Sequence, residues 1–408
     1  MYSLAGPELD FLLQIKIITI LIYNNEGESS MKRSYLALTG TAALLWTLAA
    51  QAAPTTDEKL DLLSEEVERL KAEIASQPGG QTAAGAGRTT IGGYGELHYN
   101  NLDSKKEIDF HRFVLFFGHK ISDRIRFFSE FELEHALAGE GKEGEVELEQ
   151  AYLEFDLTER LRAQGGLFLV PVGILNETHE PPTFYGVERN PVESYVVPST
   201  WWEAGASLRG ELGAGVSVDL AATSGLAMDT AWSVRNARQK VSEANADSLA
   251  YTGRLKWTGI PGLELATSLY YQPDMTQSAA GVSPVSGVLA EAHAVYSTGP
   301  FALRALYAEW TLNDDSATTG PDTTGQDEQY GWYVEPSVKL GKQWGLFARY
   351  QEWDLAAGKG SATDSLAQQT NAGINFWPHP QVVVKFDVQN QEGSISDDGY
   401  NLGIGYMF

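Results

Sequence analysis

The 408-residue sequence contains no cysteine, and this absence excludes a disulfide scaffold and any metal site built from thiolates. Positive charge is scarce as well. The chain has 29 lysine and arginine residues against 54 aspartate and glutamate residues, which gives a net charge of −25. Because nucleic-acid phosphates attract the opposite sign, we expect no nucleic acid among the partners. Hydrophobic runs long enough for a bundle of membrane helices are lacking too.

Glycine and aromatic residues are plentiful instead. The chain has 41 glycines, 10 tryptophans, 18 tyrosines and 16 phenylalanines, a composition that suggests many strands and turns. Its seven histidines are dispersed, and none lies in a nucleophile or metal motif. We therefore expect no cofactor, no metal and no enzymatic activity. A lipid-hydrolysing barrel with an outward Ser-His pair is the enzymatic alternative.

The N-terminal 52 residues have the pattern of a targeting segment. In "MKRSYLALTGTAALLWTLAAQA", residues 31–52, two basic residues precede an apolar run that ends in A-Q-A. This is the order of a secretory signal peptide. We interpret residues 1–30 as an upstream extension from a misassigned start. The alternative for that stretch is a membrane anchor, although Lys16 interrupts its short apolar patch.

A short helical pattern follows the targeting segment. Residues 56–77 repeat leucine, valine and isoleucine at 3-4-3-4 spacing, which is the a/d seam of a coiled coil. Residues 78–88 then form a flexible, glycine-containing linker. Because two heptads are marginal alone in water, we expect the helix to assemble where a larger body holds its copies together in the periplasm. A solitary amphipathic helix is the alternative.

From Thr89 onward, apolar and polar residues alternate. In "LELATSLYYQ" and "VVVKFDVQ", every second residue is apolar, which marks a strand with two unlike faces. Most such segments have the length that a tilted strand needs to cross a bilayer, and they are long for a soluble sheet. The sixteen expected strands are 89–100, 107–119, 124–135, 144–157, 160–170, 201–212, 215–224, 248–258, 262–272, 287–297, 301–312, 328–339, 344–354, 367–377, 381–391 and 398–408.

Short turns and longer polar segments alternate between these strands, as in outer-membrane barrels. The sequence therefore predicts an all-β fold, a 16-stranded antiparallel transmembrane β-barrel over residues 89–408. A soluble sandwich or soluble barrel is the alternative, but its outer surface of Phe, Leu, Val and Tyr would aggregate in water. Because a barrel in lipid has no free edge, the final strand "YNLGIGYMF" must close the sheet with its bulky stripe outward.

Three stretches carry a resemblance to a known family. "FHRFVLFFGHKISDRIRFFSEFELEH", "EQAYLEFDL…LRAQGGLFLVPVGILNE" and "QTNAGINFWPHPQVVVKFDVQ" resemble strand pairs of the phosphate-selective porin O and P family of Gram-negative bacteria. The resemblance implies a trimer of sixteen-stranded barrels with the third outer loop folded inward. Two departures remove positive charge. Phe113 and Val114 follow Arg112 where the family has further arginines, and Leu169 stands where the family often has lysine.

Residues 171–200 form the longest connection, and we predict that this loop constricts the pore. Its ionisable groups are Glu177, His179, Glu180, Glu188 and Arg189. We expect a water-filled lumen too wide for side chains to plug, because sixteen strands enclose it. Alternation points a second set of charges toward that lumen, the pore-wall residues Arg112, Arg126, Glu130, Glu132, Arg162, Glu203, Arg209, Arg254, Lys256, Arg349 and Lys385.

These features predict an outer-membrane porin that lets small hydrophilic solutes or ions diffuse passively. Opposed charges across a constriction orient dipolar solutes, whereas the alternative for each charged residue is a salt bridge that stiffens the wall. The resemblance implies a preference for anions, phosphate included. The acidic balance favours the alternative of a nonspecific, cation-leaning or organic-acid channel with a periplasmic coiled-coil tether. The expected partners are two further copies in a homotrimer, outer-membrane lipid and lipopolysaccharide, and the solutes themselves.

Overall fold

The computed structural model describes residues 88–139, 144–314, 320–358, 360 and 365–408. The predicted upstream extension (1–30), signal peptide (31–52) and coiled-coil helix (56–77) lie outside the described residues, as does all of the linker except Arg88. Within the described part of the chain, no helix is long and apolar enough to cross a membrane.

Sixteen antiparallel strands form one closed barrel, which confirms the predicted fold class. The predicted strand ends differ from the observed ones by no more than two residues. The strands are β1 (Thr89–Leu102), β2 (Lys106–Lys120), β3 (Ile125–Glu134), β4 (Val146–Asp156), β5 (Leu161–Leu169), β6 (Trp202–Gly213), β7 (Val216–Thr223), β8 (Ala250–Ile260), β9 (Leu263–Gln272), β10 (Val285–Thr298), β11 (Phe301–Asp314), β12 (Glu328–Leu340), β13 (Trp344–Asp354), β14 (Ala367–His379), β15 (Val382–Gly393) and β16 (Gly399–Met407).

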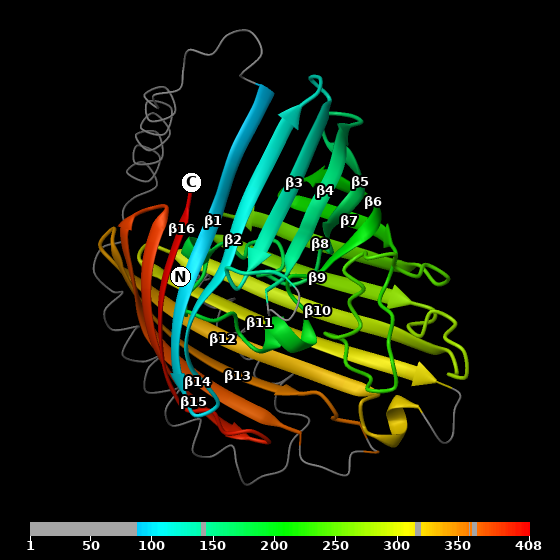
Figure 1. The fold of residues 1–408 in the computed structure, drawn as a ribbon. Helices are drawn as coiled ribbons and strands as arrows, with labels where there is room; N and C mark the ends of the chain where they lie inside the picture. Colours follow the sequence, from blue (N-terminus) through cyan, green and yellow to red (C-terminus); the bar gives the residue numbers. More distant parts are fainter. Residues whose placement is uncertain (1–87, 140–143, 315–319, 359, 361–364) are drawn as a thin grey trace, which may run out of the picture. The chain divides into compact units, whose positions relative to one another are not determined.

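The barrel closes where the first and last strands meet. β1 pairs with β16 from Tyr94 opposite Met407 to Leu102 opposite Gly399, and Figure 1 shows the two lying side by side. Gly93 and the C-terminal Phe408 exchange both backbone hydrogen bonds, at 3.0 and 2.9 Å. The last residue of the chain therefore takes part in closing the sheet, so that the backbone groups of this edge find partners within the protein.

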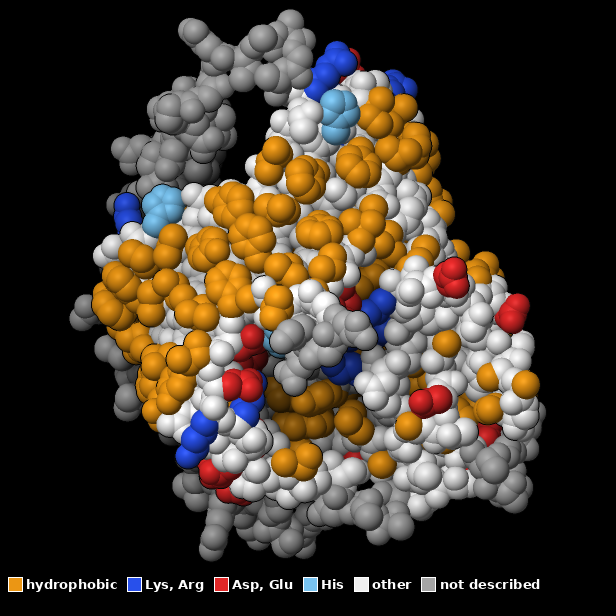
Figure 2. Space-filling view, viewed as in Figure 1, with side chains coloured by type: hydrophobic (Ala, Val, Ile, Leu, Met, Phe, Trp, Pro, Cys, Tyr) orange, Lys and Arg blue, Asp and Glu red, His pale blue; other side chains and the backbone are white. Residues whose placement is uncertain are grey.

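The outer face of the barrel is apolar. Leu402 and Ile404 of β16 are each 42% exposed, and Phe408, just after the strand, is 53% exposed, whereas Asn401, on the opposite face of β16, is fully buried. Figure 2 shows hydrophobic side chains gathered in a band over the outer surface of β1, β2, β3 and β14 to β16, with charged side chains at the margins of the band. Every second residue of the strands thus presents hydrocarbon to the surroundings.

Outward-facing aromatic pairs lie toward both ends of the barrel wall. Trp344 and Phe376, near the short turns, have ring centroids 4.3 Å apart. Trp332 and Tyr350, near the long loops, have centroids 5.4 Å apart. The two pairs flank the apolar band, as aromatic girdles do in barrels that span a bilayer.

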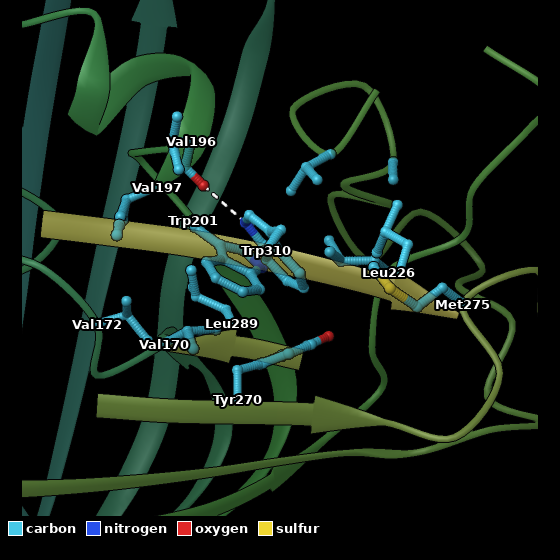
Figure 3. Packing of buried hydrophobic residues seen from close by; sticks show 14 of the residues in the cluster. Val170, Val172, Val196, Val197, Trp201, Leu226, Tyr270, Met275, Leu289 and Trp310 are labelled. Carbon is cyan, nitrogen blue, oxygen red and sulfur yellow. Dashed lines mark hydrogen bonds between the residues drawn. The ribbon is translucent and has the colours of Figure 1, made fainter. Parts of the chain in front are cut away.

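Part of the barrel interior is packed rather than open. Trp201, Tyr270 and Trp310 are buried with ring centroids 4.9 to 6.1 Å apart, and Trp310 Nε1 donates a hydrogen bond to the Val196 carbonyl at 2.8 Å (Figure 3). Leu226, from the loop between β7 and β8, joins the same cluster. The expectation of a water-filled lumen too wide for side chains to plug is therefore wrong for this region, because inward aromatic residues of the wall meet apolar residues of the loops.

Candidate functional site

The connection between β5 and β6, residues 170–201, is the inner loop. Its Glu188 contacts Asn100 of β1 at 2.8 Å, while its Glu193 accepts a hydrogen bond from Tyr333 of β12 at 2.7 Å. In Figure 1 the loop runs, in green, within the ring of strands. Because β1 and β12 are separated by four strands in one direction and ten in the other, these contacts carry the loop across the interior.

The barrel wall holds the middle of the inner loop by its main chain. Five consecutive backbone carbonyls, from Pro182 to Gly186, each accept a hydrogen bond from a side chain of β11, β13, β14 or β15. A short 3-10 turn at Pro181–Thr183 (η2) begins this stretch, and a π turn at Val192–Val196 (η3) follows it. The donors, in carbonyl order, are Trp377 (3.3 Å), Arg304 (2.9 Å), Asn375 (3.3 Å), Arg349 (3.5 Å) and Lys385 (2.8 Å).

Two arginines of the loop between β7 and β8 hold the end of the inner loop in the same manner. Arg235 donates to the carbonyls of Ser194 (2.6 Å) and Ser199 (3.0 Å), and Arg238 donates to that of Pro198 (3.1 Å). Burial and the neighbouring charge of Arg238 lower the pKa of Arg235 to about 10, so it remains a cation at neutral pH. The guanidinium groups thus satisfy carbonyls that would otherwise be buried without a partner.

Glu193 ties the inner loop to itself and to the wall. The residue is fully buried, and its Oε1 accepts hydrogen bonds from the backbone N–H groups of Ile174 and Leu175, each at 2.6 Å. Its Oε2 accepts from Tyr333 at 2.7 Å and from Asn190 at 3.3 Å. A buried carboxylate is tolerated here because both oxygens are hydrogen-bonded.

Glu177 closes a ring of alternating charges near the short-turn end of the wall. Arg209 lies 2.9 Å from Glu177 and 2.5 Å from Asp219. Arg254 pairs with the same two carboxylates, at 2.8 Å from Asp219. Burial alone would raise the pKa of Glu177, but the charges of Arg254 and Arg209 outweigh it and lower that pKa to about 2. The ring stiffens the wall and holds the start of the inner loop against it.

The remaining predicted loop residues occupy different surroundings. Glu188 contacts His98 and Asn100 of β1, and the charge of His98 overcomes burial and lowers the pKa of Glu188 below its usual range. His179 is 3% exposed and faces β3 and β4. Glu180 and Arg189 are half-buried. The structure therefore brings Glu177, Glu188 and His179 against three different parts of the wall rather than into one cluster.

The pore-wall residues fall into two groups by exposure, although the alternation of the strands turns all of them inward. Four keep part of the side chain accessible: Arg126 (34%), Arg162 (53%), Arg209 (42%) and Lys256 (29%). The others are buried against partners, so the salt bridges and loop contacts of the wall take up their charges. These are Arg112, Glu130, Glu132, Glu203, Arg254, Arg349 and Lys385.

Several contributors to the site are not among the predicted residues. Glu193, Glu149 and Arg304 all contact the inner loop or its anchors. For Glu149 and Arg304, alternation within the strand predicts a position at or next to the inward face, but it does not predict which loop residue each side chain contacts. For Glu193, the loop position carries no periodicity at all, so only three-dimensional contacts reveal its role.

No family model matches the chain. A protein of Aquifex aeolicus (strain VF5), described as uncharacterised, is 30% identical to it over 350 residues, which cover 78% of this chain and 80% of that protein.

Solved structures with similar folds are bacterial outer-membrane proteins. An anion-selective porin from Comamonas acidovorans is 11% identical, with a TM-score of 0.57, over 78% of this chain and 99% of its own. A loop-deletion mutant of OmpT, an outer-membrane protein of Vibrio cholerae, is 12% identical, with a TM-score of 0.56, over 78% and 99%. The outer-membrane channel DcaP of Acinetobacter baumannii is 12% identical, with a TM-score of 0.54, over 78% and 97%. At these identities the likeness concerns the fold, which is that of a sixteen-stranded porin.

Proposed function

We propose a function on two premises: the chain belongs to the same family as the Aquifex aeolicus protein, and its barrel has the porin fold. The protein is a passive diffusion channel of the bacterial outer membrane, and small hydrophilic solutes or ions pass through its narrowed lumen. The observation that carries this proposal is the inner loop, which lies within a closed barrel and is bonded to strands across the interior. Such a loop narrows the lumen of a barrel.

The outer surface supports the membrane location. Exposed leucine, isoleucine, valine and phenylalanine side chains alternate with inward polar ones, and aromatic pairs flank the band. In water, an apolar belt of this extent would drive association. In a bilayer whose outer leaflet is lipopolysaccharide, the same belt is solvated by hydrocarbon, and the closed sheet has no free edge.

The accessible lumen charges support weak selectivity. Arg126, Arg162, Arg209 and Lys256 form a basic arc at the short-turn end of β3, β5, β6 and β8. Acids with comparable exposure accompany them, namely Glu177 (28%), Glu188 (33%) and Glu264 (34%). Acidic groups on the inner loop and basic groups on the wall generate a transverse field that orients dipolar solutes. A nonspecific channel, suited to zwitterions and small organic acids as well as inorganic ions, fits this balance best.

A preference for anions, phosphate included, is the second candidate. One observation favours it: the four pore-wall residues that stay accessible are all basic. Arg349 and Lys385, by contrast, donate hydrogen bonds to carbonyls of the inner loop, and Arg112 forms salt bridges with Glu96 and Glu132.

Reversal potentials in a potassium chloride gradient across planar bilayers separate the two candidates. Values near zero, with little block by phosphate, support the nonspecific channel, whereas anion-directed values with phosphate block support the second candidate. Arg162→Ser should shift the reversal potential toward cations, because Arg162 is half exposed and its partner Asp156 lies 3.5 Å away. Arg160→Ser, in the turn before β5, is the matched control. No conductance by the folded protein would overturn the channel itself.

We extend the proposal to the assembly. A homotrimer, with residues 56–77 as a periplasmic coiled coil or tether, agrees with the spacing of that segment, and a trimer form is described for OmpT of Vibrio cholerae. Chemical cross-linking of the protein in native membranes should give a trimer. Deletion of 57–77 should leave conductance intact and weaken only the association of the copies, or the attachment to another envelope component.

A further inference from the structure

A buried cluster of ligand-type side chains lies where the inner loop meets β3 and β4. His179 of the loop, Glu130 of β3 and Glu149 of β4 each offer one atom, and the three atoms lie within 4.8 Å of one another. His179 Nε2 is 3.4 Å from Glu130 Oε1 and 3.7 Å from Glu149 Oε2. The side chains of both glutamates are 1% exposed and that of His179 is 3% exposed, so bulk water does not separate them.

In each of the three side chains, the polar atom that faces away from the cluster has a hydrogen-bond partner. His179 Nδ1 lies 3.2 Å from the Asn176 carbonyl, which can only accept, so Nδ1 carries the proton. In the neutral imidazole, Nε2 then has the lone pair and faces Glu130. Gln150 donates to Glu130 Oε2 at 2.6 Å, and Thr200 donates to Glu149 Oε1 at 2.6 Å. Hydrogen bonds to the far atoms aim the near atoms at one point, as the outer partners of metal ligands do.

The near atoms of His179 and Glu130 contact each other at 3.4 Å, whereas no donor in the described part of the protein satisfies the near atom of Glu149. Glu149 Oε2 is buried and accepts no hydrogen bond, and neither oxygen of the neighbouring Glu132 accepts one. Arg112 and Arg189 bring positive charge to Glu130, but Arg112 also pairs with Glu96 and Glu132. Buried carboxylates with a histidine lone pair between them repel one another unless one of them takes up a proton or a cation lies among them.

We infer that His179, Glu130 and Glu149 bind a divalent transition-metal ion, with Zn²⁺ as the probe. Zinc bonds of about 2.0–2.2 Å to nitrogen and oxygen place neighbouring tetrahedral ligands about 3.3–3.6 Å apart, close to the two separations found here. One imidazole with two carboxylates suits Zn²⁺, Fe²⁺ or Mn²⁺ better than the all-oxygen preference of Ca²⁺ or Mg²⁺. The ion ties the inner loop to the wall opposite its carbonyl anchors, so the loop is held from both sides.

A second cluster offers a natural comparison. His111 Nδ1 and His135 Nδ1 lie 3.1 and 2.9 Å from one oxygen of Asp109. Arg112, however, donates to His111 Nε2 at 2.8 Å, which leaves the proton on Nδ1 and makes that atom a donor rather than a ligand. Hydrogen bonds therefore account for this cluster, and His135→Gln is the control for loss of a histidine near the loops.

The test measures Zn²⁺ retained by the full chain, refolded in detergent with Zn²⁺ and dialysed against a weak chelator. Wild type and His135→Gln should keep about one Zn²⁺ per chain. His179→Gln and Glu149→Gln should bind at least about 100-fold more weakly, and Thr200→Val about 10- to 100-fold more weakly. Equal loss of Zn²⁺ from wild type and His179→Gln would overturn the inference, as would retention of Ca²⁺ in preference to Zn²⁺.

A second measurement covers variants that do not fold. The Tm of the wild-type protein should rise with Zn²⁺ and fall with chelator, because an ion that binds only the folded state stabilises it; no difference in Tm together with no retained Zn²⁺ would refute the site. Metal retention does not require conduction, so this result stands apart from the channel proposal. In bilayers, chelation should increase current fluctuations of wild type but not of His179→Gln.

Discussion

Removal of the Glu193 carboxylate tests whether that residue fixes the inner loop. In Glu193→Ala, the N–H groups of Ile174 and Leu175 and the hydroxyl of Tyr333 lose bonds of 2.6, 2.6 and 2.7 Å. At about 1–1.5 kcal/mol for each short bond, the free energy of unfolding should fall by about 3–5 kcal/mol. Tyr333→Phe removes one of the three and should cost about 1–2 kcal/mol.

Urea unfolding in micelles, followed by tryptophan fluorescence, measures these losses of stability. Single-channel recording measures how firmly the inner loop is held, through the size and noise of the conductance. Because the freed loop samples more positions, Glu193→Ala should show larger and noisier conductance than Tyr333→Phe. The double variant should lose less than the sum of the single losses, since both remove the same Glu193–Tyr333 bond. Additive losses, or a steady wild-type conductance in Glu193→Ala, would refute the assignment of Glu193 as the anchor.

Three further outcomes are expected. Trp310→Ala should destabilise the barrel by about 3–5 kcal/mol and Trp310→Phe by less, because Trp310 is fully buried in the interior cluster; thermal unfolding measures both. The pKa of Glu177 is lowered from 4.5 to about 2, so the stability that its carboxylate adds to the folded protein is fully present above about pH 4.5 and is lost as the pH falls toward 2. Acid should therefore loosen the inner loop in the wild-type protein but not further in Glu177→Gln. Ile404→Lys, on the outer face, should cost up to about 2–4 kcal/mol in bilayers, measured as refolding yield against an Ile404→Val control.

The strands were predictable because each carries its own signal. Alternation within a single strand, together with turn residues at its ends, fixes its span and its outward face, as in the closing strand from 399 to 407. The location of the longest connection was predictable as well, since its length and its anchoring residues are local properties. The chemistry of the interior was not predictable in this way, because each inward charge has partners on other strands or loops.

Lys385 illustrates the difference. Alternation turns it inward, but its partner, the Gly186 carbonyl, lies 199 residues away in the chain. Arg349 likewise reaches the Tyr185 carbonyl and Glu335. The interior cluster has the same origin, since Trp310 and Leu226 are ordinary strand and loop residues until the fold brings them together. Which inward groups remain open to solutes therefore depends on the path of the inner loop.

That path is specified by peptide groups. The wall bonds to consecutive carbonyls from residue 182 to residue 186, and every residue type supplies a carbonyl. A substitution at the exposed Thr183 can therefore alter what a solute meets while these bonds to the main chain remain. At that position, the surface that the inner loop presents to solutes can thus change independently of the bonds that hold its main chain to the wall.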